Sequence, residues 1–263
     1  MYQPFQPTLT AAGLQRLGIS LEFTVASGVL RHAVHCYLQI TTAKPIAYPV
    51  IPDGTQAVYI GPQNMMIGGA QSQAREIPIL QAGEYFGIWF RPGALRYIFQ
   101  LNLAEIANQF ADSNYFPCQQ FTRLADQIYQ FHAFQQRALV CEHWLLRHFQ
   151  ERPLTPFDHA LTLIYQSMGD IKIEHLANHT GWSSRHLNRQ FHRHTGLSTK
   201  AFTQIIRFQH ACKHLWHNPG EALSTALQSG YFDQAHLIRD YNRRLHSSPG
   251  AYHHRFMSDF SNR

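Results

Sequence analysis

Charged side chains are scarce in this sequence of 263 residues, and acidic side chains are the scarcest. Only 14% of the residues are Asp, Glu, Lys or Arg, against about 25% in an ordinary soluble domain. The 16 acidic residues are outnumbered by 18 histidines, and the net charge is +6. Because 44% of the residues are hydrophobic, the chain has enough apolar side chains for a core, and its low charge does not indicate disorder.

Segments that would place the chain in a membrane or outside the cell are also missing. No stretch approaches the roughly 18 apolar residues that span a bilayer, and the first ten residues lack the basic and apolar regions of a signal peptide. The four cysteines form no CxxC pair, which is typical of reduced thiols rather than of a disulfide framework; they are Cys36, Cys118, Cys141 and Cys212. We therefore expect a cytoplasmic protein.

The sequence offers little for catalysis. It contains neither the HExxH zinc motif nor a GxxxxGK[ST] phosphate loop. His32, His35 and Cys36 are close together, but on a strand His32 and His35 would point to opposite faces. A DNA-repair protein with a cysteine methyl acceptor would need a cysteine cluster, which is missing. We expect no enzyme, no catalytic residue, no metal and no cofactor.

Basic residues are concentrated in the second half of the chain. Residues 1–153 hold 10 Lys and Arg against 9 Asp and Glu, whereas residues 154–263 hold 12 against 7 and carry 13 of the 18 histidines. The segment from His175 to Gly220 has no acidic residue, six Lys or Arg and eight His. Such a balance fits either a solvated basic face or a surface that binds nucleic acid.

Periodicity divides the chain near residues 150–156. Before this point, short apolar runs separated by turn residues predict strands and a small barrel or sandwich; they are Leu21–Val25, Ala33–Ile40, Ala57–Ile60 and Tyr85–Phe90. Arg91-Pro92-Gly93 is typical of a turn from strand to helix, although it could also line a pocket. Helical spacing follows over residues 95–110, 121–131, 138–149 and 157–168, with Asn102 and Thr155 as candidate N-caps. We therefore predict an α+β protein whose domains are residues 1–152 and 153–263.

Residues 173–191 have the pattern of a helix-turn-helix. Ala177 is small enough for the crossing of two helices, Gly181 suits a turn with positive φ, and Leu187 would anchor the second helix in a core. Ser183 is a candidate N-cap for that helix. Arg185, Asn188, Arg189, His192 and Arg193 remain for its outer face. Arginine pairs with guanine and asparagine with adenine, so this face could read bases, although an ordinary pair of packed helices has the same pattern.

A second copy of this pattern favours DNA binding. Ala226, Gly230 and Leu237 repeat the first three positions with one extra residue in the turn, and Arg239 is the counterpart of Arg189. Between the copies, apolar residues from Phe202 to Trp216 predict one long helix. Two recognition helices on one rigid body could enter successive major-groove segments about 34 Å apart. We place the two units at about residues 171–194 and 221–245.

These residues resemble the DNA-binding domain of the AraC/XylS family of transcription regulators. The resemblance rests on LANHTGWSSRHLNRQFHRHTGLSTKAF and SGYFDQAHLIRDYNRRLHSSPGAY. It implies DNA contacts from both second helices, through Ser184, Arg185, Asn188, Arg189, Gln234, Ala235, His236 and Arg239. IPDGTQAVYI, the GGAQ turn and GIWFRPGALRYIF resemble the sensor-like domain of one AraC subgroup. That likeness implies a small cupin-like β-barrel with a helical appendage, and it implies no particular ligand.

Three positions depart from the family pattern. Thr225 stands where an aliphatic core residue is usual, Lys172 where a helix cap is usual, and His246 where glycine is common. A buried threonine without a hydrogen bond would cost about 1–3 kcal/mol. The threonine predicts that the second unit is less stable or less discriminating than the first.

The expected function is sequence-specific binding of double-stranded promoter DNA. The resemblance implies activation by recruitment of RNA polymerase, whereas the residues do not show the sign of regulation. A small-molecule effector and a homodimer both remain open, as does the identity of the ligand-binding residues. The alternative is a ligand-binding or interaction module that binds DNA weakly and without specificity. Because histidines gain charge in acid, we expect DNA affinity to rise as the pH falls from about 7.5 to 6.

Overall fold

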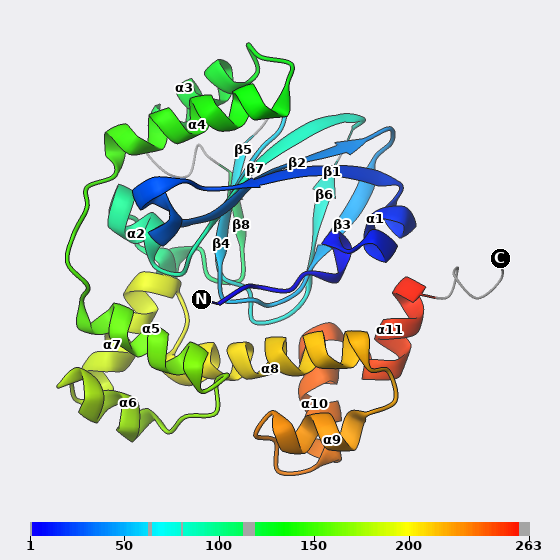
Figure 1. The fold of residues 1–263 in the computed structure, drawn as a ribbon, viewed down its shortest axis with the longest axis vertical. Coiled ribbons are helices and arrows are strands. Elements are labelled where there is room, and N and C mark those ends of the chain that lie inside the picture. Colours follow the sequence, from blue (N-terminus) through cyan, green and yellow to red (C-terminus); the bar gives the residue numbers. More distant parts are fainter. Residues whose placement is uncertain (1, 63–64, 80, 113–118, 258–263) are drawn as a thin grey trace.

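The computed structural model describes residues 2–62, 65–79, 81–112 and 119–257, in which a β-rich N-terminal part is followed by a helical C-terminal region (Figure 1). Within these residues, a six-stranded antiparallel sheet has the order β1-β2-β7-β4-β5-β8, and β3 pairs with β6 in a two-stranded sheet. The strands are β1 (Ile19–Val25), β2 (Val34–Thr42), β3 (Ile46–Val50), β4 (Gln56–Ile60), β5 (Met65–Gly68), β6 (Arg75–Ile79), β7 (Gly83–Phe90) and β8 (Phe110–Asp112).

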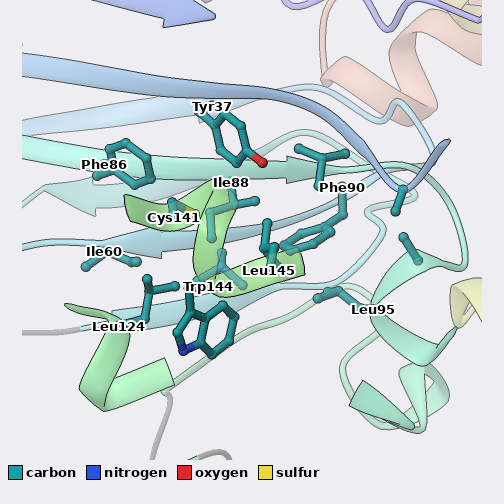
Figure 2. Close-up of a cluster of buried hydrophobic side chains, with 14 of the residues drawn as sticks. Tyr37, Ile60, Phe86, Ile88, Phe90, Leu95, Leu124, Cys141, Trp144 and Leu145 are labelled. Carbon is teal, nitrogen blue, oxygen red and sulfur yellow. The ribbon is translucent and has the colours of Figure 1, made fainter. Parts of the chain in front are cut away.

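The two faces of the large sheet have separate cores. Helices α3 (Gln119–Ile128) and α4 (Phe134–His148) cover one face, where Tyr37 and Phe86 of the sheet meet Leu124, Trp144 and other buried side chains (Figure 2). The other face packs on the two-stranded sheet, because alternate side chains of a strand point to opposite faces. Leu38 and Trp89 meet Tyr48 and Ile77 there. The β-rich fold expected from the sequence is thus confirmed.

The strands form two open sheets rather than one closed barrel. Among the described residues, no ladder of hydrogen bonds joins the small sheet to the edges of the large one. The turn at Arg91-Pro92-Gly93 leads from β7 into α2 (Ala94–Phe99), with Gly93 at φ +87°, as the residues predict for a strand-to-helix turn. Helix α1 (Ala11–Leu17) and the short 3-10 helices η1 (Pro7–Leu9) and η2 (Gly28–His32) complete the N-terminal part.

The helical spacing predicted over residues 95–110 is wrong after the end of α2 at Phe99. The chain forms only the 3-10 turn η3 (Leu103–Glu105) and then enters β8. Asn108 takes a left-handed φ of +60°, which an α-helix cannot accommodate, and its backbone N–H donates to Ala70 O. The apolar spacing that suggested a helix instead supplies buried Leu103 and Ile106 to the core. The first part of the range 95–110 matches α2, and the predicted helices over residues 121–131, 138–149 and 157–168 match α3, α4 and α5 (Pro156–Gln166) in position.

The C-terminal region is helical throughout its described length. Helix α5 begins at a capping box in which Asp158 Oδ2 accepts from both the backbone and the hydroxyl of Thr155. The helices are α5 (Pro156–Gln166), α6 (Ile173–Thr180), α7 (Ser184–Thr195), α8 (Thr199–His217), α9 (Ala222–Gln228), α10 (Gln234–Leu245) and α11 (Pro249–Met257). No helix of the described chain has the length and apolar character needed to cross a membrane.

Helix α8 joins the two ends of the helical region and lies beneath the β-rich part (Figure 1). Its Gln209 side chain is buried and accepts from Phe5 N at 2.7 Å, while Nε2 donates to Phe5 O and Pro52 O. The ring of Phe202 lies so close to Gly54 that a β-carbon there would be 2.9 Å away. The β-rich part is therefore packed directly on the helix that connects the two helix-turn-helix candidates.

Candidate nucleic-acid interface

The first candidate unit has the local geometry of a helix-turn-helix. Helix α6 ends at Gly181, whose φ of +68° is the left-handed conformation that glycine adopts without strain. Ser183 then caps α7, because its hydroxyl accepts from His186 N at 3.2 Å. Leu187 and Phe191 lie one turn apart on α7 and are fully buried beside Ala177. The anchor, turn and cap expected from the sequence are all in place.

Helix α7 presents a basic face to solvent. Ser184, Arg185 and Arg189 are exposed, and so are His192 and Arg193 farther along the helix. Arg189 Nη2 lies 3.0 Å from His186 Nδ1, so the guanidinium is held along the helix surface. These side chains could reach phosphates or base edges without any rearrangement of the core.

Asn188 is less available than its neighbours. It is half-buried, and its Oδ1 accepts from Thr199 N at 3.0 Å, which satisfies one of the free N–H groups at the start of α8. Pairing with adenine uses both the oxygen and the nitrogen of the amide. Asn188 therefore has a structural contact that the sequence did not indicate, and this contact engages its amide oxygen.

The second candidate unit repeats this arrangement. Gly230, at φ +70°, follows α9, and Asp233 caps α10 by accepting from His236 N at 2.6 Å. Gln234, Ala235 and Arg239 are exposed on α10. Arg239 is 69% exposed in its side chain and lies 3.9 Å from Asp233, a distance at which the ion pair holds it only weakly. Arg239 is thus free to engage a partner.

Two residues at the start of α10 have surroundings that the sequence did not indicate. His236 is half-buried, with its ring edge-on to Tyr231 at 5.1 Å, and its Nδ1 accepts from Phe232 N at 3.4 Å. Phe232 itself is 87% exposed in the turn that precedes α10. The sequence reasoning did not single out this exposed aromatic side chain. A signal was present, because Phe232 lies in a turn that is one residue longer than its counterpart in the first unit.

The three departures from the family pattern have separate outcomes. Thr225 is fully buried, but its hydroxyl lies 2.9 Å from His214 Nδ1, so it has the hydrogen-bond partner that a buried threonine needs. Lys172 precedes α6 and gives it no side-chain cap. His246 takes a φ of +53° at the end of α10, where its equivalent Gly196 has +78°. Because Thr225 is satisfied, its predicted penalty on the second unit does not arise.

Burial separates the histidines of this region into two groups. Burial, with nearby Arg96, lowers the pKa of His194 to about 4, and its ring stacks on Phe157 at 4.2 Å. Burial also lowers the pKa of His210. These two imidazoles are neutral near pH 7 and add no charge to a DNA-binding face. His192, by contrast, is exposed on α7.

Asp240 and Arg244 form a buried ion pair on α10, with Arg244 Nε donating to Asp240 Oδ1 at 3.0 Å. Asp240 Oδ2 accepts from Tyr231 OH at 2.8 Å. The charge of Arg244 and the hydrogen bonds hold the pKa of Asp240 below its usual range, although burial opposes them. Both charged side chains are therefore engaged within the protein.

The described residues show no cluster of three His, Cys, Asp or Glu side chains that could hold a metal ion. Cys36, Cys141 and Cys212 are buried free thiols, and burial raises the pKa of Cys36 and of Cys212 to about 12. Cys118 lies outside the described residues. Thiols with such raised pKa values are poor nucleophiles.

Two known families match separate parts of the chain. Residues 176–255 match a helix-turn-helix domain family, and residues 24–112 match a domain of unknown function, DUF6597. The first match spans both candidate units, and the second spans most of the two sheets.

Curated relatives match part of the chain, and a solved structure aligns with most of it. An uncharacterized HTH-type transcriptional regulator of Staphylococcus aureus is 28% identical over 83 residues, which are 32% of this chain and 11% of that protein. A regulator of the same description from Haemophilus influenzae is 29% identical over 121 residues, or 46% of this chain and 39% of that one. The structure of ToxT from Vibrio cholerae aligns with 90% of this chain and 97% of its own at a TM-score of 0.43 and 7% identity. The chain thus spans about a tenth of the first relative and well under half of the second.

Proposed function

The chain carries an AraC-type helix-turn-helix domain at residues 176–255, and from this premise we propose that it is a transcription regulator that binds a specific promoter sequence. Its role is binding and not catalysis. The domain at residues 153–263 binds double-stranded DNA, and the domain at residues 1–152 regulates it.

The observation that supports this proposal most strongly is the duplication of one exposed surface. Arg189 on α7 and Arg239 on α10 are both exposed, and each recognition helix is anchored from behind by a fully buried leucine, Leu187 or Leu237. A single chain thus presents two readers, one for each of two neighbouring major-groove segments. Such an arrangement suits an asymmetric DNA site.

We assign the DNA contacts by the exposure of each side chain. Bidentate bonds from an arginine to guanine give direct base reading. Bonds to phosphates come from backbone N–H groups and from basic side chains, and they set the position of the protein on DNA. The contact set is Ser184, Arg185, Asn188 and Arg189 on α7, with Gln234, Ala235, His236 and Arg239 on α10. Asn188 and His236 contribute less than the others, because their side chains already have partners within the protein.

Regulation would follow from the contact between the two domains. A signal that binds the N-terminal domain changes DNA affinity only if it binds one arrangement of the domains better than another. Activation through RNA polymerase is the family's mode and is our proposal for this chain. A small-molecule effector and self-association are the two candidate signals.

The proposal is tested by selection of bound sequences from a random DNA pool, followed by footprinting of the selected site with the full chain. We expect protection of two major-groove segments about one helical turn apart. Substitution of Arg239 by Ala should remove protection from one segment and leave the other. A pool that yields no enriched sequence would instead support the alternative, an interaction module that binds DNA without specificity.

A further inference from the structure

A cavity lies between the two sheets of the N-terminal domain. Its apolar part has a volume of about 240 Å³ and is lined by Leu38, Ile40, Met66, Ile77 and other side chains. A smaller part of about 50 Å³ shares Leu38, Ile40, Tyr48 and Tyr59 with it and continues towards α8. Because these four side chains line both parts, the two parts adjoin each other.

The end of the cavity near α8 is polar. Gln71 is 6% exposed, and its Nε2 donates to Gly69 O at 2.8 Å and to Gln109 O at 3.2 Å. These two carbonyl acceptors fix which end of the amide is nitrogen. Its Oε1 is buried without a hydrogen-bond partner in the part of the chain that the structure describes. A buried acceptor left unpaired costs about 1–3 kcal/mol, and a donor group brought to this oxygen would remove that cost.

The charges around the cavity restrict that ligand. None of the described residues that line it is a lysine, an arginine or a histidine. Asp53 is the acidic residue of the lining, and its carboxylate oxygens already accept from Thr55 and from Gln6 Nε2. Burial raises the pKa of Asp53. An anionic ligand would find no positive partner in this lining and a carboxyl group beside it.

The polar end is connected to the second recognition helix by one short segment. The β5–β6 loop, residues 69–74, carries Gln71 and continues to Ser72 and Ala74. Arg244 of α10 donates from Nη1 to Ser72 O at 3.1 Å, and its own backbone oxygen accepts from Ala74 N at 2.6 Å. Asn108 Oδ1 accepts from both the backbone and the hydroxyl of Ser72 at 2.7 Å and holds this loop in place.

We infer that the cavity is a binding site for an uncharged amphipathic ligand, whose head donates a hydrogen bond to Gln71 Oε1 and whose apolar tail lies between the sheets. The ligand acts on DNA binding through the β5–β6 loop, because the loop that carries Gln71 also holds α10 at Arg244. The assignment of the binding site depends only on the cavity and its lining residues. The effect of the ligand on DNA binding rests on the proposed function.

Three probes of one length test the ligand class with the full chain: octanamide, octanoate and octylammonium. We expect octanamide to raise the melting temperature in a saturable way, and the two charged probes to have little effect at the same concentration. Gln71→Met should weaken octanamide at least about fivefold, the loss expected for one hydrogen bond. The exposed Gln15→Met is the matched control and should leave the affinity unchanged. Ile77→Phe, which fills the apolar part, should also reduce binding.

The link to DNA is tested separately with Asn108→Gly, which keeps the positive φ and removes the side chain that holds Ser72. In the unaltered protein, octanamide should change the affinity for the selected DNA at least threefold, and DNA should change the affinity for octanamide by the same factor. Asn108→Gly should bind octanamide normally but lose most of this coupling.

Several results would overturn the inference. The ligand class is wrong if octanoate or octylammonium binds as tightly as octanamide, or if no probe binds. The role of Gln71 is wrong if Gln71→Met leaves the affinity for octanamide unchanged. The route through the β5–β6 loop is wrong if Asn108→Gly leaves the coupling between octanamide and DNA unchanged. Failure of the proposed function would look different, because the chain would then select no DNA sequence whether or not octanamide binds.

Discussion

The contact between the domains depends on the side chain of Gln209. Gln209 is 2% exposed on α8 and makes three hydrogen bonds to the N-terminal domain, two with the backbone of Phe5 and one with Pro52 O. Gln209→Leu keeps about the same volume and removes all three bonds. At about 0.5–1.5 kcal/mol for each of the three bonds, the free energy of unfolding should fall by about 1.5–4.5 kcal/mol.

Urea unfolding followed by circular dichroism measures this loss, and hydrogen exchange locates it. The amide of Phe5 should exchange faster in Gln209→Leu, because its acceptor is gone. Gln204→Leu, a half-buried position on the same helix, is the matched control and should change stability by less than about 0.5 kcal/mol. Equal stability of the Gln209 variant and the unaltered protein, with unchanged exchange at Phe5, would refute this account of the domain contact.

Three further predictions concern the helical region. Arg189→Ala should cost about 1–3 kcal/mol of binding free energy on the selected DNA and much less on random DNA; a filter-binding series in which both fall equally would contradict base reading. Thr225→Val should lower stability by about 1–2 kcal/mol in thermal unfolding, because it leaves His214 Nδ1 unpaired; a more stable variant would contradict the role of that bond. The lowered pKa of His194 means that the unfolded chain takes up a proton first as the pH falls, so stability should be lost between pH 6.5 and about 4. His194→Gln should flatten this loss, and an unchanged pH profile of stability would contradict this assignment.

The helix-turn-helix units could be predicted because their signals are local. Ala177, Gly181 and Leu187 lie within eleven residues, and each is tied to a need of the motif itself: a close crossing, a positive φ and a buried anchor. The second copy at Ala226, Gly230 and Leu237 repeats all three. Patterns of this kind depend on helix geometry and not on distant parts of the chain.

The N-terminal domain was harder to predict because its form depends on distant partners. Strands β3 and β6 contain Pro49 and Pro78 in a two-stranded sheet with free edges, where proline is tolerated but weakens a sequence-based assignment. The turn at Asn108 follows from backbone bonding to Ala70, far away in the sequence. Local periodicity cannot show such a contact, and it therefore predicted a helix.

Contacts with distant residues also explain why the surroundings of Asn188 and Arg244 were not predicted from the sequence. Asn188 has the residue type and the place of a base reader, yet its oxygen caps α8 eleven residues later. Arg244 was counted as one more basic residue near α10, whereas it is buried between Asp240 and Ser72. The sequence gives residue types on a helix, and packing decides which of them remain free.

The central claim is that the chain reads a DNA sequence with two duplicated helices. Its most direct test is the ratio of the affinities of the full chain for the selected site and for a scrambled site of the same composition, measured at physiological salt. The account predicts a preference of about 10³ or more for the selected site. Equal affinity for the two, falling together as salt is raised, would show that the basic faces of α7 and α10 bind only the phosphate backbone, and it would contradict the account.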